Sequence, residues 1–419
     1  MPEKDSKKKK KFKYTPLSVK DIIREMKQTI DSMIDLAYSA IKFGSKEIAD
    51  EAYRLEGRIH ELTYLLNFQI IQTQAGGIKE AKRLEPIVVM GYSIDKISDA
   101  LSDIARVVYI NSDITEFTQF SGIWGVPEPI VKVKVAEGCE FAGKPRQEIH
   151  FRSQHGVNLI AIKRDDQWLF NREEIVMEND ILIIKGEIQP IIEMKQLCCD
   201  EEPLSFEIDE EKKRFDFDLE NSEVYEHLTE LKKTYVQITD ISETMIELAL
   251  ASLFFNNYEL AEDILEMEEL MDGLNIAFEK DLLHFAHLVE SPRYLTGIMR
   301  IVFSCELIAD AAADIAENII KGFKPHRILQ KAIRETEEIV VREILSEDSY
   351  FKGKSYHELQ DRRYKRGFNI IALKREDKWI YSFKPDFIFE ENDLLIGLGP
   401  KETVQEWRRC VNPEKYKEE

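Results

Sequence analysis

The sequence contains no uninterrupted stretch of about 18 apolar residues, the length that a helix needs to cross a bilayer, so no membrane-spanning segment is expected. The first residues lack the apolar core of a secretory signal peptide. The five cysteines are odd in number and form neither a CxxC motif nor a Cys/His zinc spacing. Because this pattern excludes disulfide frameworks and zinc modules, we expect a reduced cytoplasmic protein that is at most peripheral to the membrane.

Motifs for catalysis and for nucleotide phosphates are also missing. No GxGxxG sequence follows an expected strand, no phosphate-binding loop is present, and no nucleophile has a base at a recognisable spacing. These absences predict a regulatory protein rather than an enzyme. One enzymatic alternative stays open, a metal-dependent hydrolase, because the acidic stripes described below could hold a catalytic metal.

Positive charge in excess is confined to one end of the chain. The net charge is −21, although the first thirteen residues, MPEKDSKKKKKFK, carry seven lysines against two acidic residues, or +5. The rest of the chain therefore carries −26 and should repel phosphates, so no nucleic-acid partner is expected. We expect the Lys-rich tail to be disordered. It is either a weak attachment to anionic lipid or an acidic partner, or only a solubilising end.

What the sequence does contain is a long internal repeat. The segment GVNLIAIKRDDQWLF begins at Gly156, and GFNIIALKREDKWIY begins 211 residues later at Gly367. SMIDLA and TMIELA are related by a shift of 212, and ENDILI and ENDLLI by a shift of 213. The matches keep the same order in both halves. We therefore infer a tandem duplication of one composite unit, in a chain long enough for roughly two to four domains.

Each unit combines a helical part with a mixed part. In the first copy, apolar residues recur at helical spacing over residues 17–43, 46–73 and 84–111, separated by the Gly-containing breaks KFGSKE and QAGGIKE. This pattern predicts three antiparallel helices. In the mixed part, IVKVKV, NLIAIKR, QWLF and DILIIKG are typical of strands, and KPRQEIHFRSQHG and IQPIIEMKQL are typical of helices.

The predicted fold class is therefore α+β, with two three-helix bundles alternating with two small mixed domains. A duplicated unit of this kind also predicts self-association, either between the copies within one chain or between two chains. The expected boundaries are 1–16 for the Lys-rich tail, 17–115 for the first bundle, 125–199 for the first mixed domain, 200–222 for an acidic linker, 223–325 for the second bundle and 330–413 for the second mixed domain.

Carboxylates recur at every fourth position on the third helix of each bundle. Such residues share one line along a helix, where like charges repel one another and a cation would relieve the repulsion. With ligands from the neighbouring helix, namely Glu56 and His60 or Glu268 and Asp272, they could bind Mg²⁺, Fe or Mn. The recurring carboxylates are Asp95, Asp99 and Asp103 in the first copy and Glu306, Asp310 and Asp314 in the second.

A second interpretation of these carboxylates needs no metal. An apolar stripe on the same helix, running from Ile97 to Val108, lies nearly opposite the aspartates when each residue turns the helix by about 100°. The carboxylates would then form a solvated acidic face. The flanking positions are small in both copies, for example Ser98 and Ala309, which indicates the close approach of another group. Both interpretations stay open at this stage.

Three-helix units with these E/DxxxD motifs resemble the PhoU family. The resemblance implies bundles that bind metal clusters and regulate the uptake of phosphate or a cation across a membrane. His60 departs from the aspartate that is usual in the family. Carried over to this sequence, the resemblance implies metal ligands at Glu56, Asp95 and Asp99 in the first copy and at Glu268, Asp272, Glu306 and Asp310 in the second.

The segments GKPRQEIHFRSQHGVNLIAIKR and GKSYHELQDRRYKRGFNIIALKR resemble the TrkA-C or RCK-C domain of potassium-channel regulators. Both have a Gly-Lys turn, a short helix, an arginine and a Gly-x-Asn sequence that opens an apolar strand. The resemblance implies domains that pair as dimers and, in some members, bind cyclic di-AMP. It implies ligand contacts from Arg152, Asn158 and Ile160 in the first copy and from Arg363, Asn369 and Ile371 in the second.

The arginine and asparagine of this motif have two interpretations. An arginine side chain suits a phosphate and an asparagine suits the edge of a base, which favours a nucleotide ligand. Alternatively, Asn158 caps a turn and Arg152 pairs with an acidic neighbour, in which case both are structural. Taken together, the resemblances predict a regulatory subunit that modulates cation transport, in particular of potassium, and contacts a membrane channel or transporter. The alternative to this function is a PhoU-type adaptor in phosphate-uptake signalling.

Overall fold

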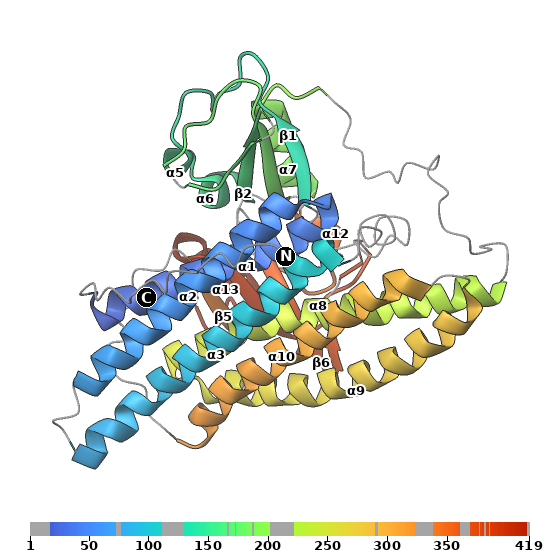
Figure 1. The fold of residues 1–419 in the computed structure, drawn as a ribbon. Coiled ribbons are helices and arrows are strands. Elements are labelled where there is room, and N and C mark those ends of the chain that lie inside the picture. The colour runs from blue at the N-terminus through green and yellow to red at the C-terminus, as the bar shows by residue number, and fades with distance from the viewer. Residues whose placement is uncertain are drawn as a thin grey trace, which may run out of the picture.

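The computed structural model of the chain consists of two helical bundles and two small sheets (Figure 1). The Lys-rich tail and nearly all of the expected acidic linker lie outside the residues that it describes. Within the described part of the chain, no helix is both long enough and apolar enough to span a bilayer. The described residues are 17–72, 77–110, 130–165, 167–171, 173–186, 188–201, 222–289, 292–322, 338–360, 369–376, 378–380, 383–384 and 386–416.

The first bundle consists of α1 (Val19–Phe43), α2 (Lys46–Gln72) and α3 (Gly77–Ile110). Local chemistry sets where α1 begins and ends. The Ser18 hydroxyl accepts a hydrogen bond from a backbone N–H of the first turn and so caps the helix. Gly44 follows the last turn in the left-handed conformation, with a φ of 58°, which glycine adopts without a steric cost.

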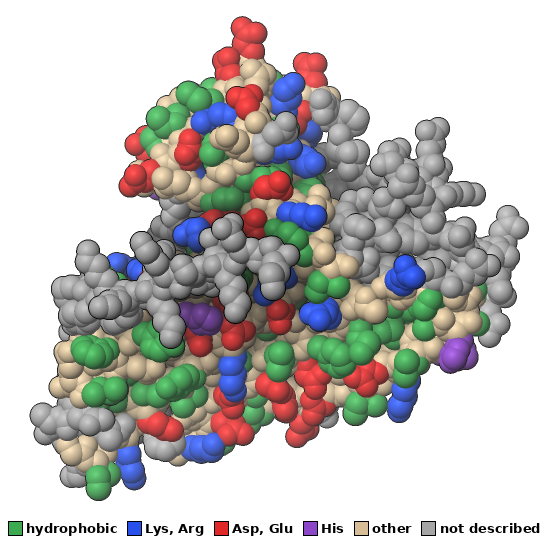
Figure 2. Space-filling model, viewed as in Figure 1, with side chains coloured by type: hydrophobic (Ala, Val, Ile, Leu, Met, Phe, Trp, Pro, Cys, Tyr) green, Lys and Arg blue, Asp and Glu red, His purple; other side chains and the backbone are tan. Residues whose placement is uncertain are grey.

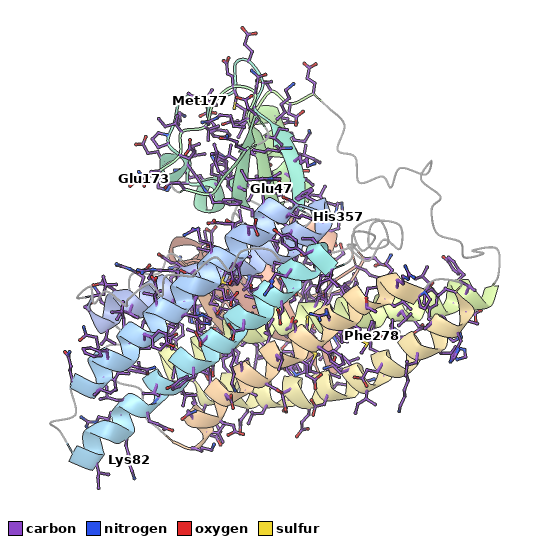
Figure 3. The ribbon with its side chains drawn as sticks, viewed as in Figure 1. Glu47, Lys82, Glu173, Met177, Phe278 and His357 are labelled. Atoms are coloured by element: carbon purple, nitrogen blue, oxygen red, sulfur yellow. The ribbon has the colours of Figure 1, made fainter. Side chains whose placement is uncertain are left out.

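The helix α3 begins seven residues earlier than the sequence predicted, at Gly77 instead of residue 84. As a result, Pro86 lies in the interior of the helix instead of in its first turn. A proline at this place cannot donate to the carbonyl four residues earlier. That carbonyl belongs to Lys82, which is exposed, so water can satisfy it. Lys82 marks the end of the bundle that is farthest from the first sheet (Figure 3).

The second bundle repeats the arrangement with α8 (Ser222–Phe255), α9 (Tyr258–Leu288) and α10 (Leu295–Ile320), the last preceded by the short 3-10 helix η2 (Pro292–Tyr294). The Asn257 side chain caps α9 by accepting a backbone hydrogen bond. The helices α3 and α10 pack against each other, so the two bundles share one hydrophobic core. They lie side by side as one layered body (Figure 1).

The small residues beside the acidic stripes belong to this helix packing. Ser98 and Ser102 on α3, like Ala309 and Ala313 on α10, are all buried. Because neighbouring helices already cover these positions, they are closed to any group from outside. The close approach that the sequence indicated is therefore made by the protein's own helices, since small side chains let helix backbones come near one another.

The first sheet is antiparallel and has the strand order β1-β4-β2-β3. A bulge interrupts the pairing of β2 with β4 between Leu159 and Ala161. The single helix predicted before β2 is divided in two by His150, whose φ of 50° is left-handed. The elements are β1 (Ile130–Lys134), α5 (Arg146–Ile149), α6 (Phe151–His155), β2 (Val157–Arg164), β3 (Gln167–Leu169), β4 (Ile181–Gly186) and α7 (Ile188–Leu197).

The second sheet has the same topology, with the order β5-β8-β6-β7 and a bulge between Ile370 and Ala372. The duplication seen in the sequence is thus present in the structure, down to the irregularity in the third strand of the sheet order. The elements are β5 (Glu338–Ile344), α12 (Tyr356–Gln360), β6 (Asn369–Arg375), β7 (Lys378–Ile380), β8 (Leu394–Pro400) and α13 (Lys401–Val411).

Each sheet is buried on both faces. One face of the first sheet, including Ile160 and Ile183, joins the core of the helical bundles, and the other face packs on α7. In the second sheet, Ala372 and Ile396 face the bundles, whereas Leu395 packs with Trp407 of α13. The sheets are therefore fixed to the helical layer by apolar packing, and this places their polar residues at the edges of the contact.

Candidate functional site

Acidic side chains gather over the middle of the helical layer, on the face below the first sheet (Figure 2). Asp99 and Asp103 of α3 are exposed, and Asp95 is half-buried. The outward direction that the apolar stripe predicted is therefore observed. Outward-facing carboxylates remain compatible with metal binding, since ligands from a second helix can close a site on the surface.

In the first bundle, α2 and α3 bring three potential ligands together. The ligand atoms of Glu56, His60 and Asp99 all lie within 4.8 Å of one another. His60 Nε2 is 3.0 Å from Asp99 Oδ1 and 3.6 Å from Asp95 Oδ1. An imidazole with two or three carboxylates suits Fe, Mn or another transition metal better than Mg²⁺, which prefers oxygen ligands. Among the described residues, no other group of three or more His, Cys, Asp or Glu side chains has its ligand atoms within this distance of one another.

The acidic residues of the second bundle come from α9 and α10 and are more widely spread. Burial raises the pKa values of Glu268, Glu306 and Asp310, and the negative charge of their neighbours, chiefly Asp272 and Asp310, raises them further. A cation would relieve this repulsion. One counter-charge on this face is Lys96 of α3, whose Nζ lies 2.6 Å from Asp314 Oδ2 and links the two bundles.

The predicted ligand residues of the first sheet lie where the sheet meets the helices. The Asn158 amide donates a hydrogen bond to Asp35 of α1, and Ile160 is buried in the shared core. Ile160 therefore contacts the helices in this arrangement and is not open to the ligand that the resemblance implied. Arg152 lies in α6, but its side chain is outside the described part of the structure.

In the second copy, Ile371 is half-buried and packs against the shared core. Asn369 is the first residue of β6, although its side chain is not among those described. Arg363 lies in residues 361–368, which are outside the described chain. Whether these residues bind a nucleotide stays a prediction in both copies.

An ion-pair network surrounds Asn158 and connects the first sheet to both bundles. Lys185 of β4 lies 3.5 Å from Asp35 Oδ1 on α1 and 3.3 Å from Glu243 Oε2 on α8. All three side chains are at most about one third exposed. Burial raises the pKa of the nearby Asp240 well above its usual value, Glu243 adds to the rise, and Lys185 opposes it. The Lys185 ammonium group thus interacts with three carboxylates, one from the first bundle and two from the second.

The first sheet lies above the start of α2, where Figure 3 labels Glu47 in the first turn of that helix. Hydrogen bonds from its own backbone N–H and from the Ser45 hydroxyl lower the pKa of Glu47, and the charge of Lys163 on β2 contributes. Lys163 of the sheet is therefore close enough to Glu47 at the start of α2 for a favourable charge interaction. This electrostatic match adds to the apolar contact.

The second sheet is joined to α9 by a separate set of ion pairs. Arg342 of β5 lies 3.1 Å from Asp263 and 2.7 Å from Glu259, and Lys374 of β6 is paired with Glu266. Burial raises the pKa of Asp263, and Arg342 opposes that rise. These contacts all reach the second bundle, in contrast to Lys185, which reaches both.

A repeated arginine clamp is the feature that the sequence reasoning missed. Arg164 holds buried Asp180 through two hydrogen bonds of 2.7 and 2.8 Å, and Arg375 holds Asp393 in the same way. Each aspartate also accepts a backbone N–H from its own turn. The signal was present, because the strand-ending Lys-Arg and the Glu-Asn-Asp turn recur in both copies. The clamp fixes the ends of the β2–β4 and β6–β8 pairs and has a structural role.

Comparison with known proteins supports the two kinds of unit. Residues 23–108 and 235–319 match the PhoU domain, and residues 130–198 match the TrkA-C domain. These matches confirm the predicted combination of domains and, with the observed sheets, the α+β class. The second sheet, which lies beyond the TrkA-C match, has the same strand order as the first.

One curated relative is the phosphate-specific transport system accessory protein PhoU homolog of Aquifex aeolicus (strain VF5). It is 27% identical over 101 residues, which are 23% of this chain, and the chain spans 46% of the length of that relative. Among solved structures, PhoU from Pseudomonas aeruginosa is 12% identical over 76% of this chain and 96% of its own, with a TM-score of 0.38. The GsuK RCK domain is 14% identical over 72% of this chain and 70% of its own, with a TM-score of 0.17.

Proposed function

We propose that this chain, which carries two PhoU domains and a TrkA-C domain, is a regulatory protein of a membrane ion-transport system and acts without catalysing a reaction. The observation that carries the proposal is the junction at Lys185, where one residue of the TrkA-C sheet is paired with α1 of the first bundle and with α8 of the second. A ligand on the sheet has a direct physical route to both PhoU domains through this junction.

The mechanism follows from what the junction joins. Asn158 and Lys185 lie on adjacent strands and both contact Asp35. A ligand that takes over the amide of Asn158 releases one of the bonds that hold the carboxylate, and the position of the sheet on the helices changes with it. Such a ligand shifts the protein only by the difference between its affinities for the two arrangements. Cyclic di-AMP is the ligand that we propose to test first.

The acidic faces are the second proposed element. Glu56, His60 and Asp99, with Asp95 nearby, would hold a transition metal between α2 and α3. Glu268, Asp272, Glu306 and Asp310 would hold a second ion between α9 and α10 once they move closer together. In both bundles the ion would neutralise crowded carboxylates and stiffen the contact between two helices.

The transported ion is proposed to be a cation, with potassium first. The name of the Aquifex aeolicus relative supports phosphate as the second candidate. The partner in the first case is a membrane cation channel or transporter, contacted from the cytoplasmic side. The protein would be a regulator whichever ion is transported, so the experiment has to measure the uptake of each ion separately.

The decisive experiment has two parts. The tagged full chain is cross-linked to native membranes, and the captured membrane proteins are identified by mass spectrometry. Rubidium and phosphate uptake are then measured in cells with and without the gene. Recovery of a cation transporter together with a change in rubidium uptake alone supports the first candidate, and a change in phosphate uptake alone supports the second. Unchanged uptake of both ions would refute the proposed function.

The ligand is tested separately by isothermal titration calorimetry with cyclic di-AMP. Binding that is lost in Asn158→Ala would support a nucleotide at the first sheet. Lys134→Ala is the matched control, because Lys134 is an exposed residue of β1 in the same sheet. Absence of heat in the wild-type chain would refute the nucleotide ligand and leave the regulatory role of the chain to be judged by the uptake experiment.

A further inference from the structure

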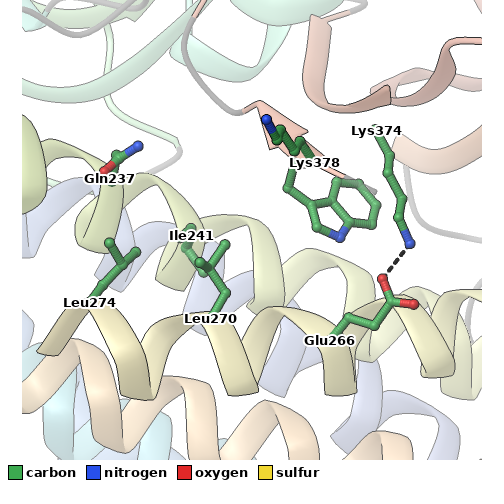
Figure 4. Close-up of a pocket in the computed structure, with 8 residues that line it drawn as sticks. Gln237, Ile241, Glu266, Leu270, Leu274, Lys374 and Lys378 are labelled. Atoms are coloured by element: carbon green, nitrogen blue, oxygen red, sulfur yellow. Dashed lines mark hydrogen bonds and ion pairs between the residues drawn. The ribbon is translucent and has the colours of Figure 1, made fainter. Parts of the chain in front are cut away.

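A cavity of about 530 Å³ lies between the second bundle and the β6–β7 hairpin (Figure 4). Its floor is the groove between α8 and α9, with the apolar side chains of Ile241, Leu270 and Leu274. Its opposite wall is Trp379 of β7. A volume of this size is in the range of cavities that hold small organic ligands.

The charged residues of the cavity leave a positive charge on its rim. Lys374 and Lys378 supply two ammonium groups, and Glu266, which is paired with Lys374, supplies one carboxylate. Lys378 is exposed and makes no ion pair with any residue that the structure describes. The cavity therefore has one positive charge in excess, although the chain as a whole carries −21. An apolar floor, an aromatic wall and a single excess positive charge together match an amphipathic monoanion.

The duplication shows that this composition is particular to the second copy. With the shift of 212 residues that relates the bundles, Gln237 and Leu270 correspond to Glu25 and Arg58 of the first bundle. There, Arg58 Nε lies 2.7 Å from Glu25 Oε1 and joins the two helices across the groove. The second copy replaces this ion pair with an amide and an apolar side chain, and the groove is open at that point.

The strand side of the cavity also differs between the copies, and it gains a positive charge in the second. Trp379 and Lys374 correspond to Trp168 and Lys163 of the first sheet, so the aromatic wall and one lysine are common to both copies. Lys378 corresponds to Gln167, so the second lysine is new. Five of the eight lining positions thus differ between the copies, because Ile241 and Glu266 also correspond to different residues, Thr29 and Arg54. Four of these differences add apolar surface, remove a negative charge or add a positive one, whereas Glu266 places a carboxylate where the first copy has an arginine.

We propose that this cavity binds a small organic monoanion with a flat apolar body. The body lies between Trp379 and the leucine side chains of α9, and its carboxylate, sulfonate or phosphate group contacts Lys378 and Lys374. The occupant touches α8, α9 and β7 at once and therefore holds the second sheet against the second bundle. That this contact regulates transport rests on the proposed function above, but the binding itself does not.

Anilinonaphthalene sulfonate is the first ligand to test, because it is a flat aromatic monoanion whose fluorescence rises in apolar sites. The uncharged N-phenylnaphthylamine is its matched neutral partner. Both dyes are titrated into the full chain. We expect saturable binding of one molecule of the anionic dye per chain. Lys378→Gln installs the residue of the first copy. It should lower the affinity for the anionic dye by about threefold and leave the affinity for the neutral dye unchanged, since one partly screened charge is removed.

The double variant Gln237→Glu with Leu270→Arg transfers the ion pair of the first copy to the second. It keeps the net charge of the cavity and fills its floor, so it should lower the affinity for both dyes by at least about tenfold. The reverse exchange in the first copy, Glu25→Gln with Arg58→Leu, is the matched control. It should leave the affinity of the cavity in the second copy for both dyes unchanged. Circular dichroism verifies that each variant is folded.

Absence of saturable binding of the anionic dye would overturn the proposal. So would equal affinity of the wild-type chain and the folded double variant, because the dye would then bind elsewhere. Loss of binding in the reverse exchange would overturn it as well, since it would place the dye on the first bundle. These measurements involve no transporter, so they do not test the proposed function, which only the uptake experiment tests.

Discussion

Replacing Lys185 with methionine tests whether the junction between the first sheet and the two bundles is held by charge. Methionine keeps the length and the apolar stem of lysine and removes the ammonium group. Asp35 and Glu243 then lose the cation that lies 3.5 and 3.3 Å from their oxygen atoms. The Oδ2 atom of Asp240 is already buried and accepts no hydrogen bond from any residue in the described chain. The variant therefore leaves three carboxylates close together at the edge of an apolar contact.

The size of the effect follows from these distances. At an effective dielectric constant of about 20, each of the two pairs is worth about 5 kcal/mol of direct attraction before the cost of desolvation. Removing one partner of a largely buried pair typically lowers the free energy of unfolding by about 3–5 kcal/mol. Because Glu243 is 34% exposed and partly screened by water, we expect the lower end, about 3 kcal/mol.

The loss should also depend on pH, with a sign that the pKa of Asp240 determines. Burial raises this pKa above its unfolded value, and Lys185 opposes the rise. A carboxyl group with a raised folded-state pKa costs no stability at low pH, and its cost grows as the pH rises from the unfolded towards the folded value. Without Lys185 the folded value is higher still. The destabilisation by Lys185→Met should thus be larger at about pH 8 than at about pH 4.

Urea-induced unfolding of the full chain at the two pH values measures the loss, and amide hydrogen exchange in α1, α8 and β4 locates it. Lys134→Met is the control, since Lys134 is exposed on β1 of the same sheet, and it should change stability by less than about 0.5 kcal/mol. A loss below about 1 kcal/mol, equal at both pH values, would refute the reasoning. It would mean that water screens the network and that apolar packing alone holds the sheet.

Three further predictions concern other parts of the chain. Asp180→Ala and Asp393→Ala should each lower the free energy of unfolding by about 3–5 kcal/mol in urea titrations, because each leaves an arginine clamp without its buried partner. Mn²⁺ should raise the Tm of the full chain, and His60→Ala should remove part of this rise, since one of three close ligands is lost. Ser98→Leu should lower stability by about 1–3 kcal/mol, because Ser98 is buried in helix packing that has no room for a larger side chain.

Each of these three has its own control. Glu174→Ala removes the outer and more exposed partner of Arg164 and should have a smaller effect than Asp180→Ala; equal effects would contradict the clamp. For the metal, an excess of chelator should reverse the rise in Tm, and an undiminished rise in His60→Ala would place the ion elsewhere. For the packing, Asp103→Leu on the exposed face of α3 should be tolerated, and a loss equal to that of Ser98→Leu would contradict the assigned faces.

The order and type of the helices and strands could be predicted because each sequence pattern occurs twice, once in each copy of the repeat. The 211-residue shift related strands that later proved to have the same order in both sheets. Helix α3 was predicted too short because the Gly-containing QAGGIKE segment favours a break, whereas exposed Lys82 allows the helix to extend past Pro86. Local signals of this kind fix the type of an element better than its ends.

The packing partner of each sheet could not be predicted from the same signals. The apolar run NLIAIKR indicates a strand that is buried on both faces, but it does not say that one face meets α1. The resemblance to the TrkA-C domain led us to expect a ligand contact from Ile160, although this residue lies in the shared core. In the same way, the spacing of Asp95 and Asp99 gave their direction on α3, whereas their distance from His60 depends on the rotation of α2, which no local pattern encodes.

The two copies have diverged in how each sheet is attached, and this makes the duplicated chain functionally asymmetric. Lys185 ties the first sheet to α1 and α8, which belong to different bundles, so a displacement of that sheet acts on the relation between the bundles. Arg342 and Lys374 pair the second sheet with α9, and β5 packs on α8, so among the described contacts its displacement acts mainly within the second bundle. A ligand at the first sheet and an anion in the cavity beside Trp379, both proposed above, would therefore bias different motions. Two signals can then be combined in one chain, because the helices that they share form a single packed core.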